Sequence, residues 1–371
     1  MIGFKLKTMM VVILTVQFLP YSGIHPQFVL GESAKLDQDL EDQLGDVNIL
    51  MLVHNSVGRN ALDVKKVLES WNCTVTTVGV LLTNKKVCDN RGETVYIDTD
   101  LKIAEVNSMI LATYDCLFVP SGAYWNEVSQ TEEITSFIEK AYNEGLIISS
   151  MCVGTGILGK AGDIVSGSKF ICHPNSGQLL LDSGGIIEKA DVLRDGQFLT
   201  GGTGGGWRQG GNVKAPYYEF SAALVQEILG YSYCEKMELE STNNASLKTE
   251  YSLSISTANL SSPINSLPGV KKHYIARINL LVSDPKDPTV EIRVPLEKSS
   301  TTTFNLTFDL NEYRKMDLMV EIITNNSEVE VFRNLENPIQ ASIPGGTPIR
   351  VIFISFVSFI ILFSRHRKKI A

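Results

Sequence analysis

The run Leu146–Leu158 constrains the fold of this chain more than any other segment. Its apolar first half ends on Cys152, and small residues then lead at once into a helical pattern. This order is typical of a nucleophile elbow, in which a buried strand turns sharply and presents the residue at the turn. Gly154 and Gly156 allow the next helix to pack closely, and a helix N-terminus favours a thiolate. Cys152 is therefore the candidate nucleophile, with a buried structural cysteine as the alternative.

Strand-like and helix-like segments alternate around this elbow. Continuous apolar strands that alternate with helices predict a parallel sheet covered on both faces, that is, an α/β fold. Ligands bind such sheets beyond the carboxyl ends of the strands, where Cys152 falls. The expected strands are Val47–Val53, Thr74–Leu82 and Cys116–Val119, and the expected helices are Asn60–Trp71 and Thr131–Glu144.

Three further blocks accompany the elbow at suitable spacing. They are Tyr114–Gly122 (YDCLFVPSG), Gly167–Pro174 (GSKFICHP) and Ala215–Val225, which opens a final helix. In this combination the chain resembles the DJ-1/PfpI (ThiJ) family of the class I glutamine amidotransferase-like superfamily. The resemblance covers Asp46 to Tyr231, and it implies a flavodoxin-like parallel sheet sandwiched by helices. Members of the family are commonly dimers, so the resemblance also implies a homodimer.

The resemblance assigns roles around the cysteine. The backbone N–H groups of Gly122 and Val153 are the expected oxyanion donors, and His173 occupies the His-Pro position that the family brings close to the elbow. A histidine satisfied by the backbone at a strand end is the alternative for His173. The family typically places a glutamate early in the first helix, where this chain has Asn60. An amide cannot exchange a proton near neutral pH, so Asn60 weakens the case for catalysis.

Four other residues are candidates for the pocket wall. His54 lies at the end of the first strand, on the same rim as Cys152, where it could complement His173, but a solvent-exposed histidine is the interpretation that we favour. Tyr124 follows Gly122, and core packing would also explain it. Trp207 and Arg208 lie in a glycine-rich loop and would cap the pocket, with Arg208 meeting a substrate carboxylate. A surface loop without a ligand is the alternative for both.

The second half of the chain differs in composition from the first half. We place the α/β domain at residues 46–235 and a Ser/Thr/Asn-rich linker at 236–266. Short alternating runs then predict a small antiparallel β-sandwich at 267–336, followed by a stalk at 337–348. The five runs are 273–282, 289–294, 302–308, 318–323 and 328–332.

Both ends of the chain are apolar and contain no acidic residue. Residues 1–30 have a basic start, a short apolar core and then small residues, which is typical of a signal peptide. Residues 349–364 predict a transmembrane anchor or a sorting signal, and 365–371 a basic cytoplasmic tail. We therefore expect a cell-surface protein, held on the secreted side of the membrane by a C-terminal single-pass anchor.

Charge and cysteine spacing exclude several classes of protein. The formal net charge of −8 argues against nucleic-acid binding. None of the six cysteines forms a CxxC pair, so we expect no metal site, and no nucleotide motif indicates a cofactor. Cys116 and Cys172 lie in apolar runs and should be buried thiols. In an oxidising compartment some cysteines could pair, and Cys73 with Cys88 is the nearest candidate in the sequence.

Three functions fit the sequence. The first is a cysteine-dependent hydrolase or amidase that acts on a small carbonyl compound or peptide through Cys152 and His173. The second is a non-catalytic surface protein whose α/β domain binds a ligand or partner. The third is a redox sensor that uses an oxidisable Cys152.

Overall fold

The computed structural model divides the chain into residues 1–38 and 39–371. The residues that it describes all belong to the second unit: 40–88, 94–202, 217–231, 234–243, 249–257, 264, 267, 269–270, 274–284, 287–298, 303–309, 317–325, 328–333 and 351–353. The predicted signal peptide, stalk and tail lie outside these residues, as do Trp207 and Arg208.

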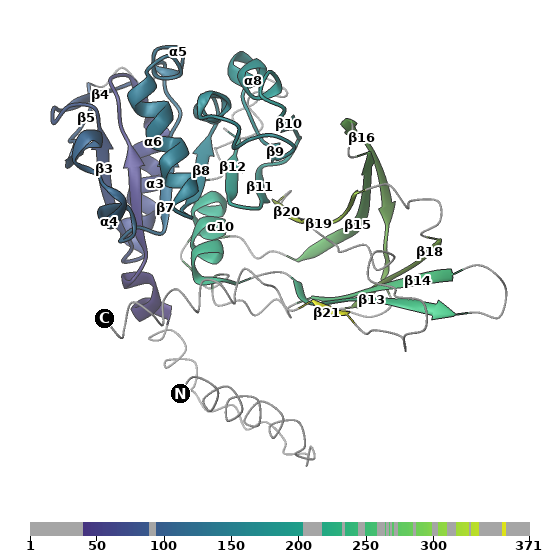
Figure 1. Ribbon diagram of the computed structural model, residues 1–371. Helices are drawn as coiled ribbons and strands as arrows, with labels where there is room; N and C mark the ends of the chain where they lie inside the picture. The colour runs from purple at the N-terminus through teal and green to yellow at the C-terminus, as the bar shows by residue number, and fades with distance from the viewer. Residues whose placement is uncertain are drawn as a thin grey trace, which may run out of the picture. The chain divides into compact units, whose positions relative to one another are not determined.

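A large, mostly parallel sheet forms the centre of the α/β domain (Figure 1). Neighbouring strands run in the order β12-β8-β7-β1-β3-β6, and every pair in this row is parallel. β11 continues the row beyond β12 in the antiparallel direction. The strands are β1 (Asn48–Leu52), β3 (Thr74–Gly79), β6 (Leu101–Lys102), β7 (Cys116–Val119), β8 (Ile147–Met151), β11 (Val192–Asp195) and β12 (Phe198–Gly201).

Burial explains why these segments form central strands. Every residue of β7 and β8 is buried, so both faces of the sheet are covered. Helices α3 and α10 pack against each other, and α6 packs against β8. The helices are α3 (Arg59–Ser70), α4 (Ser108–Leu111), α5 (Trp125–Val128), α6 (Glu132–Asn143), α7 (Gly154–Ile157), α8 (Pro174–Leu181) and α10 (Tyr217–Leu229), with 3₁₀ turns η1 (Ile103–Glu105) and η2 (Leu158–Lys160). The predicted α/β alternation is confirmed.

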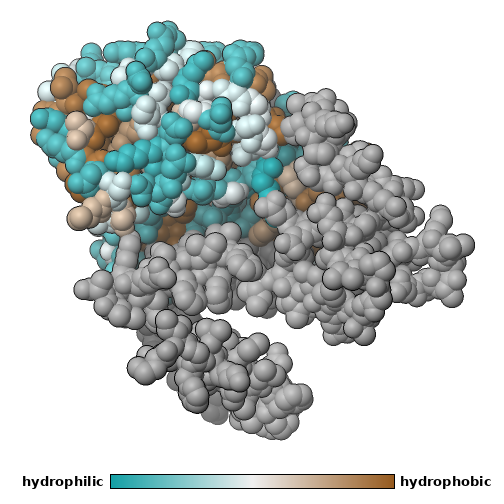
Figure 2. Space-filling model, in the orientation of Figure 1, coloured by the Kyte–Doolittle hydropathy of each residue, from teal (hydrophilic) through white to brown (hydrophobic). Residues whose placement is uncertain are grey.

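Short strands complete the surface of this domain. β2 (Val57–Gly58), β4 (Lys85–Cys88) and β5 (Tyr96–Ile97) form one small sheet, and β9 (Lys169–Phe170) pairs with β10 (Ile186–Ile187). Hydrophilic and hydrophobic residues are interspersed over the visible face of the α/β domain (Figure 2).

All five predicted runs of the second half form strands, and they belong to two sheets. β15, β16, β19 and β20 share one sheet, and β17, β18, β14, β13 and β21 form the other. Leu253 and Ile255 of β14 pack with Ile278, Leu280 and Val320 of the first sheet, as in a sandwich. The bounds are β13 (Cys234–Asn243), β14 (Thr249–Thr257), β15 (Ile275–Asp284), β16 (Asp287–Pro295), β17 (Glu297–Lys298), β18 (Thr303–Asp309), β19 (Asp317–Thr324), β20 (Glu328–Phe332) and β21 (Val351–Phe353).

The segment predicted as a linker, 236–266, differs from that expectation because it holds most of β13 and all of β14. Its composition is that of a linker, yet Leu253 and Ile255 alternate with serines. This period of two buries the apolar residues on one face of a strand. The alternation decides the structure here, and the composition misled the prediction.

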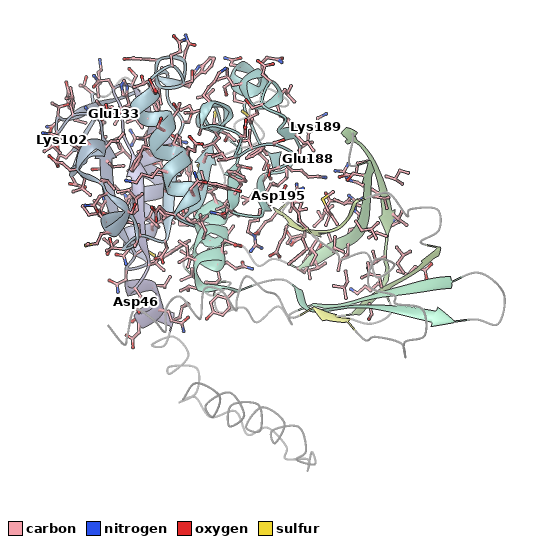
Figure 3. All side chains as sticks on the ribbon, viewed as in Figure 1. Asp46, Lys102, Glu133, Glu188, Lys189 and Asp195 are labelled. Atoms are coloured by element: carbon pink, nitrogen blue, oxygen red, sulfur yellow. The ribbon has the colours of Figure 1, made fainter. Side chains whose placement is uncertain are left out.

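The two halves share one continuous sheet. β20 pairs in parallel with β11, which joins the sandwich strands to the α/β sheet in a single eleven-stranded sheet. Leu193 and Ile171 pack with Leu281, Met319 and Val329 across this junction. Glu188, Lys189 and Asp195 lie on the side of the α/β domain where β20 joins (Figure 3).

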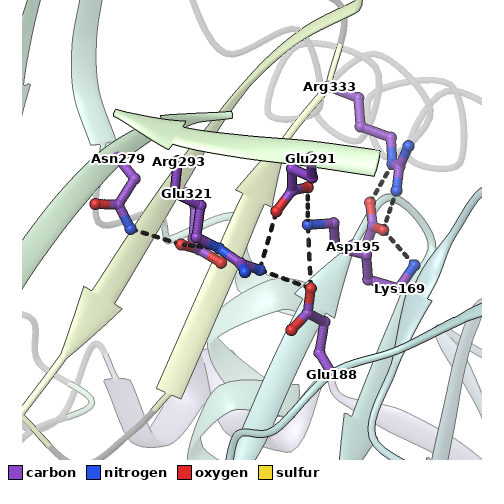
Figure 4. A network of polar contacts seen from close by, with 8 residues as sticks. All are labelled: Lys169, Glu188, Asp195, Asn279, Glu291, Arg293, Glu321 and Arg333. Carbon is purple, nitrogen blue, oxygen red and sulfur yellow. Dashed lines mark hydrogen bonds and ion pairs between the residues drawn. The ribbon is translucent and has the colours of Figure 1, made fainter. Parts of the chain in front are cut away.

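A network of charged side chains surrounds the same junction (Figure 4). Lys169 is 1% exposed, and its ammonium pairs with Glu188 at 3.3 Å and with Glu291. Arg293 contacts Glu188 at 2.7 Å, and Asp195 accepts hydrogen bonds from Arg333. Lys169 belongs to the Gly-Ser-Lys block of the family resemblance, so in this protein that lysine serves the junction between the two halves.

The predicted membrane segment, 349–364, lies mostly outside the described residues. Its residues Val351–Phe353 form β21, which pairs antiparallel with β13. Among the residues described, no helix combines the length and the apolar composition that a membrane crossing requires.

Candidate active site

Cys152 sits at the end of β8 in a backbone conformation that L-residues rarely adopt. Its φ is +58°, and its side chain is 6% exposed. The backbone holds this turn from both sides: the Cys152 N–H donates to Gly201 at 3.0 Å, and the Cys152 carbonyl accepts from Thr155 at 3.3 Å. The strand-to-helix turn that the sequence predicted is therefore present, with the cysteine at its sharpest point.

Glycine allows the chain to continue from this turn. A Cβ atom on Gly154 would lie 2.4 Å from the carbonyl oxygen of Pro120, at the end of β7. A Cβ atom on Gly156 would lie 2.4 Å from Cβ of Ser176 in α8. Real side chains do not tolerate such contacts, so both positions require glycine for α7 to pack closely.

His173 lies directly against the elbow through its backbone. Its N–H donates to the carbonyl oxygen of Cys152 at 3.2 Å. The side chain caps α8, because Nδ1 accepts the N–H of Asn175 at 3.0 Å, and Pro174 follows at the first helical position. Burial lowers the pKa of His173 below its ordinary value. The neutral ring then carries its proton on Nε2, so it can donate a hydrogen bond but cannot accept one there.

The two predicted oxyanion donors lie in the segments that follow β7 and β8. Gly122 forms an isolated bridge with Val57, in which Gly58 N–H donates to Ser121 at 2.6 Å and Ala123 N–H donates to Ser56 at 2.9 Å. The bridge therefore does not use the N–H of Gly122. Val153 is the N-cap residue of α7, so its N–H belongs to the first turn, where backbone donors have no helical acceptor.

Tyr124 packs beneath this site. Its ring lies so close to Gly122 that a Cβ there would be 2.1 Å from Cε1, and its hydroxyl donates to the Pro120 carbonyl. Burial, and to a smaller extent the charge of Cys152, raise the pKa of the Tyr124 hydroxyl. Tyr124 is therefore a buried neighbour of the cysteine, bonded to the backbone that forms the site.

His54 reaches the same rim and meets a carboxylate. Its ring centroid lies 5.7 Å from that of Tyr124, and its Nε2 lies 3.8 Å from Oε1 of Glu127 in α5. The sequence interpretation did not include Glu127. Glu127 lies in the one-turn helix α5, in the same post-β7 segment that supplies Gly122 and Tyr124. The side chain of Glu127 is 72% exposed, so it faces solvent and not Cys152.

Asn60 lies at the start of α3, and its amide is buried. The residue is 6% exposed, and neither its Oδ1 nor its Nδ2 has a hydrogen-bond partner among the residues described. A Cβ atom on Gly58 would lie 2.8 Å from Oδ1 of Asn60 and 2.9 Å from the Ser121 carbonyl oxygen. The amide is thus turned back toward the end of β7. None of the residues in the first turn of α3 is acidic.

The remaining cysteines separate into two groups. Cys73 and Cys116 are buried free thiols, and burial raises the pKa of each to about 12. The suggested pairing of Cys73 with Cys88 is wrong, because Cys73, directly before β3, is a free thiol. Cys172 is half-buried, its Sγ lies 3.7 Å from the Cys152 carbonyl oxygen, and burial raises its pKa to about 11.

The structure thus gathers most of the predicted residues at one edge of the sheet. The segments after β1, β7 and β8 meet there, because these three strands are parallel neighbours. They carry His54 and Asn60, Gly122 and Tyr124, and Cys152 and Val153, while His173 contacts the elbow from α8. The described part of the chain holds no group of three or more acidic, histidine or cysteine side chains arranged to bind a metal ion.

Part of the chain is similar to known proteins. Residues 49–207 match the DJ-1/PfpI family. Isonitrile hydratase from Pseudomonas putida is 29% identical over 126 residues, which are 34% of this chain and 50% of that protein. The chain therefore spans about half the length of the curated relative that it matches.

Two solved structures illustrate the similarity. A ThiJ/PfpI family protein from Pseudomonas syringae has a TM-score of 0.43 at 21% identity, covering 58% of this chain and 77% of that one. DJ-1beta from Drosophila melanogaster has a TM-score of 0.40 at 20% identity, covering 50% of this chain and 91% of that one.

Proposed function

From the premise that residues 49–207 belong to the DJ-1/PfpI family, we propose that this protein is a cysteine-dependent hydrolase-like enzyme. Its substrate is a small organic compound with an electrophilic carbon. The observation that carries the proposal is the φ of +58° at Cys152. Strain of this kind persists where the surrounding structure enforces it, and it is concentrated at functional sites.

The chemistry assigns one step to each group around the cysteine. The Cys152 sulfur attacks the electrophilic carbon, and negative charge develops on the atom bound to that carbon. The N–H groups of Gly122 and Val153 hold this charge, as backbone donors do in an oxyanion hole. His173 donates a hydrogen bond to the substrate through Nε2–H. Its Nδ1 is not free for this role, because it accepts the backbone N–H of Asn175. With an amide, the intermediate expels the amine, which takes up the thiol proton, and leaves a thioester on Cys152; water then attacks the thioester and releases the acid and the thiol. With an isonitrile, the thiol adds to the carbon to give a thioimidate, and water attacks that carbon and releases the formamide and the thiol.

The name of the relative supports a small substrate. Isonitrile hydratase is, by that name, an enzyme that adds water to isonitriles, which are small neutral compounds with a carbon–nitrogen multiple bond. Isonitriles and amides share a carbon that a thiolate can attack and that water can then release from the sulfur. These two classes are the first substrates to test.

Turnover of these compounds by the wild type and by two variants tests the proposal. We expect Cys152→Ala to lose at least about 1,000-fold in kcat/KM, since it removes the nucleophile. His173→Asn keeps a side chain that can cap α8, and we expect it to lose about 10- to 100-fold. Turnover that survives in Cys152→Ala would contradict the proposal.

A non-catalytic ligand-binding role is the second candidate, and Asn60 favours it. The position where the family resemblance implies a glutamate holds a buried amide that cannot exchange protons near neutral pH. Binding of these compounds without turnover by the wild type would establish this alternative.

The proposed location outside the cytoplasm depends on the chain ends. Residues 1–30 and 349–364 are apolar, and residues 365–371 are basic. We expect the full chain in the membrane fraction, with the α/β domain accessible to a protease added outside intact cells. Recovery of the full chain from the cytosolic fraction would contradict this part of the proposal.

A further inference from the structure

The N-terminus of α3 lies beside the segment that follows β7, where Gly58 N–H donates to the Ser121 carbonyl oxygen. This helix is twelve residues long, and its N-cap residue, Gly58, has no side chain with which to cap the first N–H groups. A helix N-terminus carries partial positive charge, and most helices of this length satisfy it with a capping oxygen or an acid. In α3 the N-cap residue supplies no side-chain oxygen and the first turn contains no acid. This end of the helix lies beside the end of β7.

Asn60 adds a second, independent observation at the same place. Its side chain is 94% buried, since it is 6% exposed, and both amide atoms are without a partner among the residues described. A buried amide that makes no hydrogen bond costs free energy, so such groups are rare unless they have a purpose. An apolar residue of similar shape would avoid that cost.

The amide is directed to the segment that carries the oxyanion donor. Oδ1 of Asn60 and the carbonyl oxygen of Ser121 both lie within 3 Å of the Cβ position on Gly58. Gly122 follows Ser121, and Pro120 precedes it and contacts Gly154 beside the nucleophile. One short segment, 120–122, therefore links Asn60 to the elbow.

We propose that Asn60 binds the carboxamide group of a neutral amide substrate. Oδ1 accepts the substrate N–H, and Nδ2 donates to the substrate carbonyl. An amide matches both unpaired atoms at once, whereas a carboxylate or a ketone supplies acceptors only and leaves Oδ1 unpaired. This inference uses the proposed function to place the reacting carbon near Cys152, but binding of the amide does not require the cysteine.

Binding to the Cys152→Ala protein tests the inference without turnover. The probes are acetamide, acetate and acetone, which are similar in size and differ in their hydrogen-bonding groups. We expect acetamide to bind on the order of tenfold more tightly than either of the others, as measured by chemical-shift titration of the full chain. Asn60→Leu in the same background should remove this preference. Equal binding of the three probes, or a preference that survives Asn60→Leu, would overturn the inference.

Thermal unfolding separates a binding role from a structural one. If Asn60 serves the substrate, Asn60→Leu removes two unpaired polar atoms and the melting temperature rises or stays level. If Asn60 supports the fold, the same change lowers it, and that outcome sinks the inference. Asn143→Leu, at the exposed end of α6, is the matched control and should change neither binding nor melting.

Failure of this inference differs from failure of the proposed function. Turnover that depends on Cys152 but shows no preference for amides would contradict the role of Asn60 and would still support the proposed enzymatic activity. Tight acetamide binding that depends on Asn60, without turnover of any amide, would support the role of Asn60 and contradict the proposed enzymatic activity.

Discussion

Cys152 combines backbone strain with a place at the candidate active site. An L-residue with φ near +60° brings its Cβ close to the following carbonyl, which costs about 1–2 kcal/mol. The bonds to Gly201 and Thr155 hold the turn in place in spite of this cost. The strain makes a prediction about stability that is independent of any substrate.

At position 152, glycine should be more stabilising than alanine. We expect Cys152→Gly to exceed Cys152→Ala by about 1 kcal/mol in the free energy of unfolding, measured by urea denaturation. Ser149, in the middle of β8, is the control. There the alanine variant should have a free energy of unfolding about 0.5–1 kcal/mol higher than the glycine variant. The same order at both positions would contradict the strained turn.

His173 should make the protein less stable in mild acid. Its folded pKa is lowered by burial, so below the unfolded value of about 6.5 the unfolded chain binds a proton that the folded chain resists. The stability that His173 contributes is therefore present above pH 6.5 and is lost as the pH falls from there toward the folded pKa. The slope is at most about 1.4 kcal/mol per pH unit.

His173→Asn isolates this effect, because asparagine caps a helix and does not titrate. Urea unfolding at a series of pH values from 7.5 to 5 should show a smaller fall in stability for the variant than for the wild type. Parallel curves for the two proteins would show that His173 does not titrate in this way.

At this scale the sequence predicted residue types better than their contacts. Cys152, Gly122 and Asn60 could be located because strand ends and motif spacing fix their positions. Glu127 could not, since its approach to His54 depends on the one-turn helix α5, which leaves no periodic signal. The cap that His173 forms on α8 also depends on a side-chain orientation that spacing does not reveal.

At the scale of elements, the site depends on how closely α7 approaches the end of β7. Gly154→Ala would place a methyl group 2.4 Å from the Pro120 carbonyl oxygen, so α7 or β7 must shift. We expect a loss of about 2–3 kcal/mol in the free energy of unfolding. The measurement is urea denaturation, with Cys152 alkylation as a second readout of the displaced elbow.

Gly145→Ala is the comparison for this variant. Gly145 has a φ of +86° and no atom within 4 Å of its Cβ position, so alanine there adds backbone strain without a clash. We expect it to cost about 1 kcal/mol and to leave Cys152 unchanged. Equal losses in the two variants would mean that close packing at Gly154 is unimportant.

Periodicity predicted most elements and failed where composition opposed it. The alternating runs from 273 to 332 all became strands, because a period of two buries one face regardless of the neighbours. β13 and β14 were missed because serine, threonine and asparagine there suggested a linker. The buried pair Leu253 and Ile255 was the signal that should have prevailed.

At the scale of the whole molecule, buried charges join the two halves. Arg194 of β11 is 2% exposed and pairs with Glu328 and Glu330 of β20, each at 3.3 Å, and with Glu227 of α10 at 3.5 Å. Removal of one member of a buried cluster leaves the others uncompensated, which is strongly destabilising. The pairing of β11 with β20 should therefore depend on Arg194.

Arg194→Met tests this dependence. We expect a loss of about 3–5 kcal/mol in the free energy of unfolding, with protease cleavage between the two halves becoming faster. Arg277→Met changes an exposed arginine of β15 and should stay within about 0.5 kcal/mol of the wild type. A melting curve for Arg194→Met that matches the wild type would contradict the buried junction.

The junction itself could not be predicted from the sequence. β11 and β20 are more than one hundred residues apart, and no local pattern specifies which distant edge a strand will join. The acidic residues of β20 alternate with apolar ones as in any half-exposed strand, and nothing in this pattern shows that Glu328 and Glu330 pair with Arg194. The α/β domain and the sandwich were recognisable separately, whereas their shared sheet was not.

The central claim is that Cys152 is a reactive nucleophile, and alkylation tests it most directly. The native protein is treated with chloroacetamide at pH 7.5, and modification at Cys73, Cys116, Cys152 and Cys172 is followed by peptide mass spectrometry. Burial raises the pKa of Cys73 and Cys116 to about 12 and that of Cys172 to about 11, so these three should react slowly. We predict that Cys152 is modified at least about tenfold faster than each of them. A Cys152 that reacts as slowly as Cys116 would contradict the account.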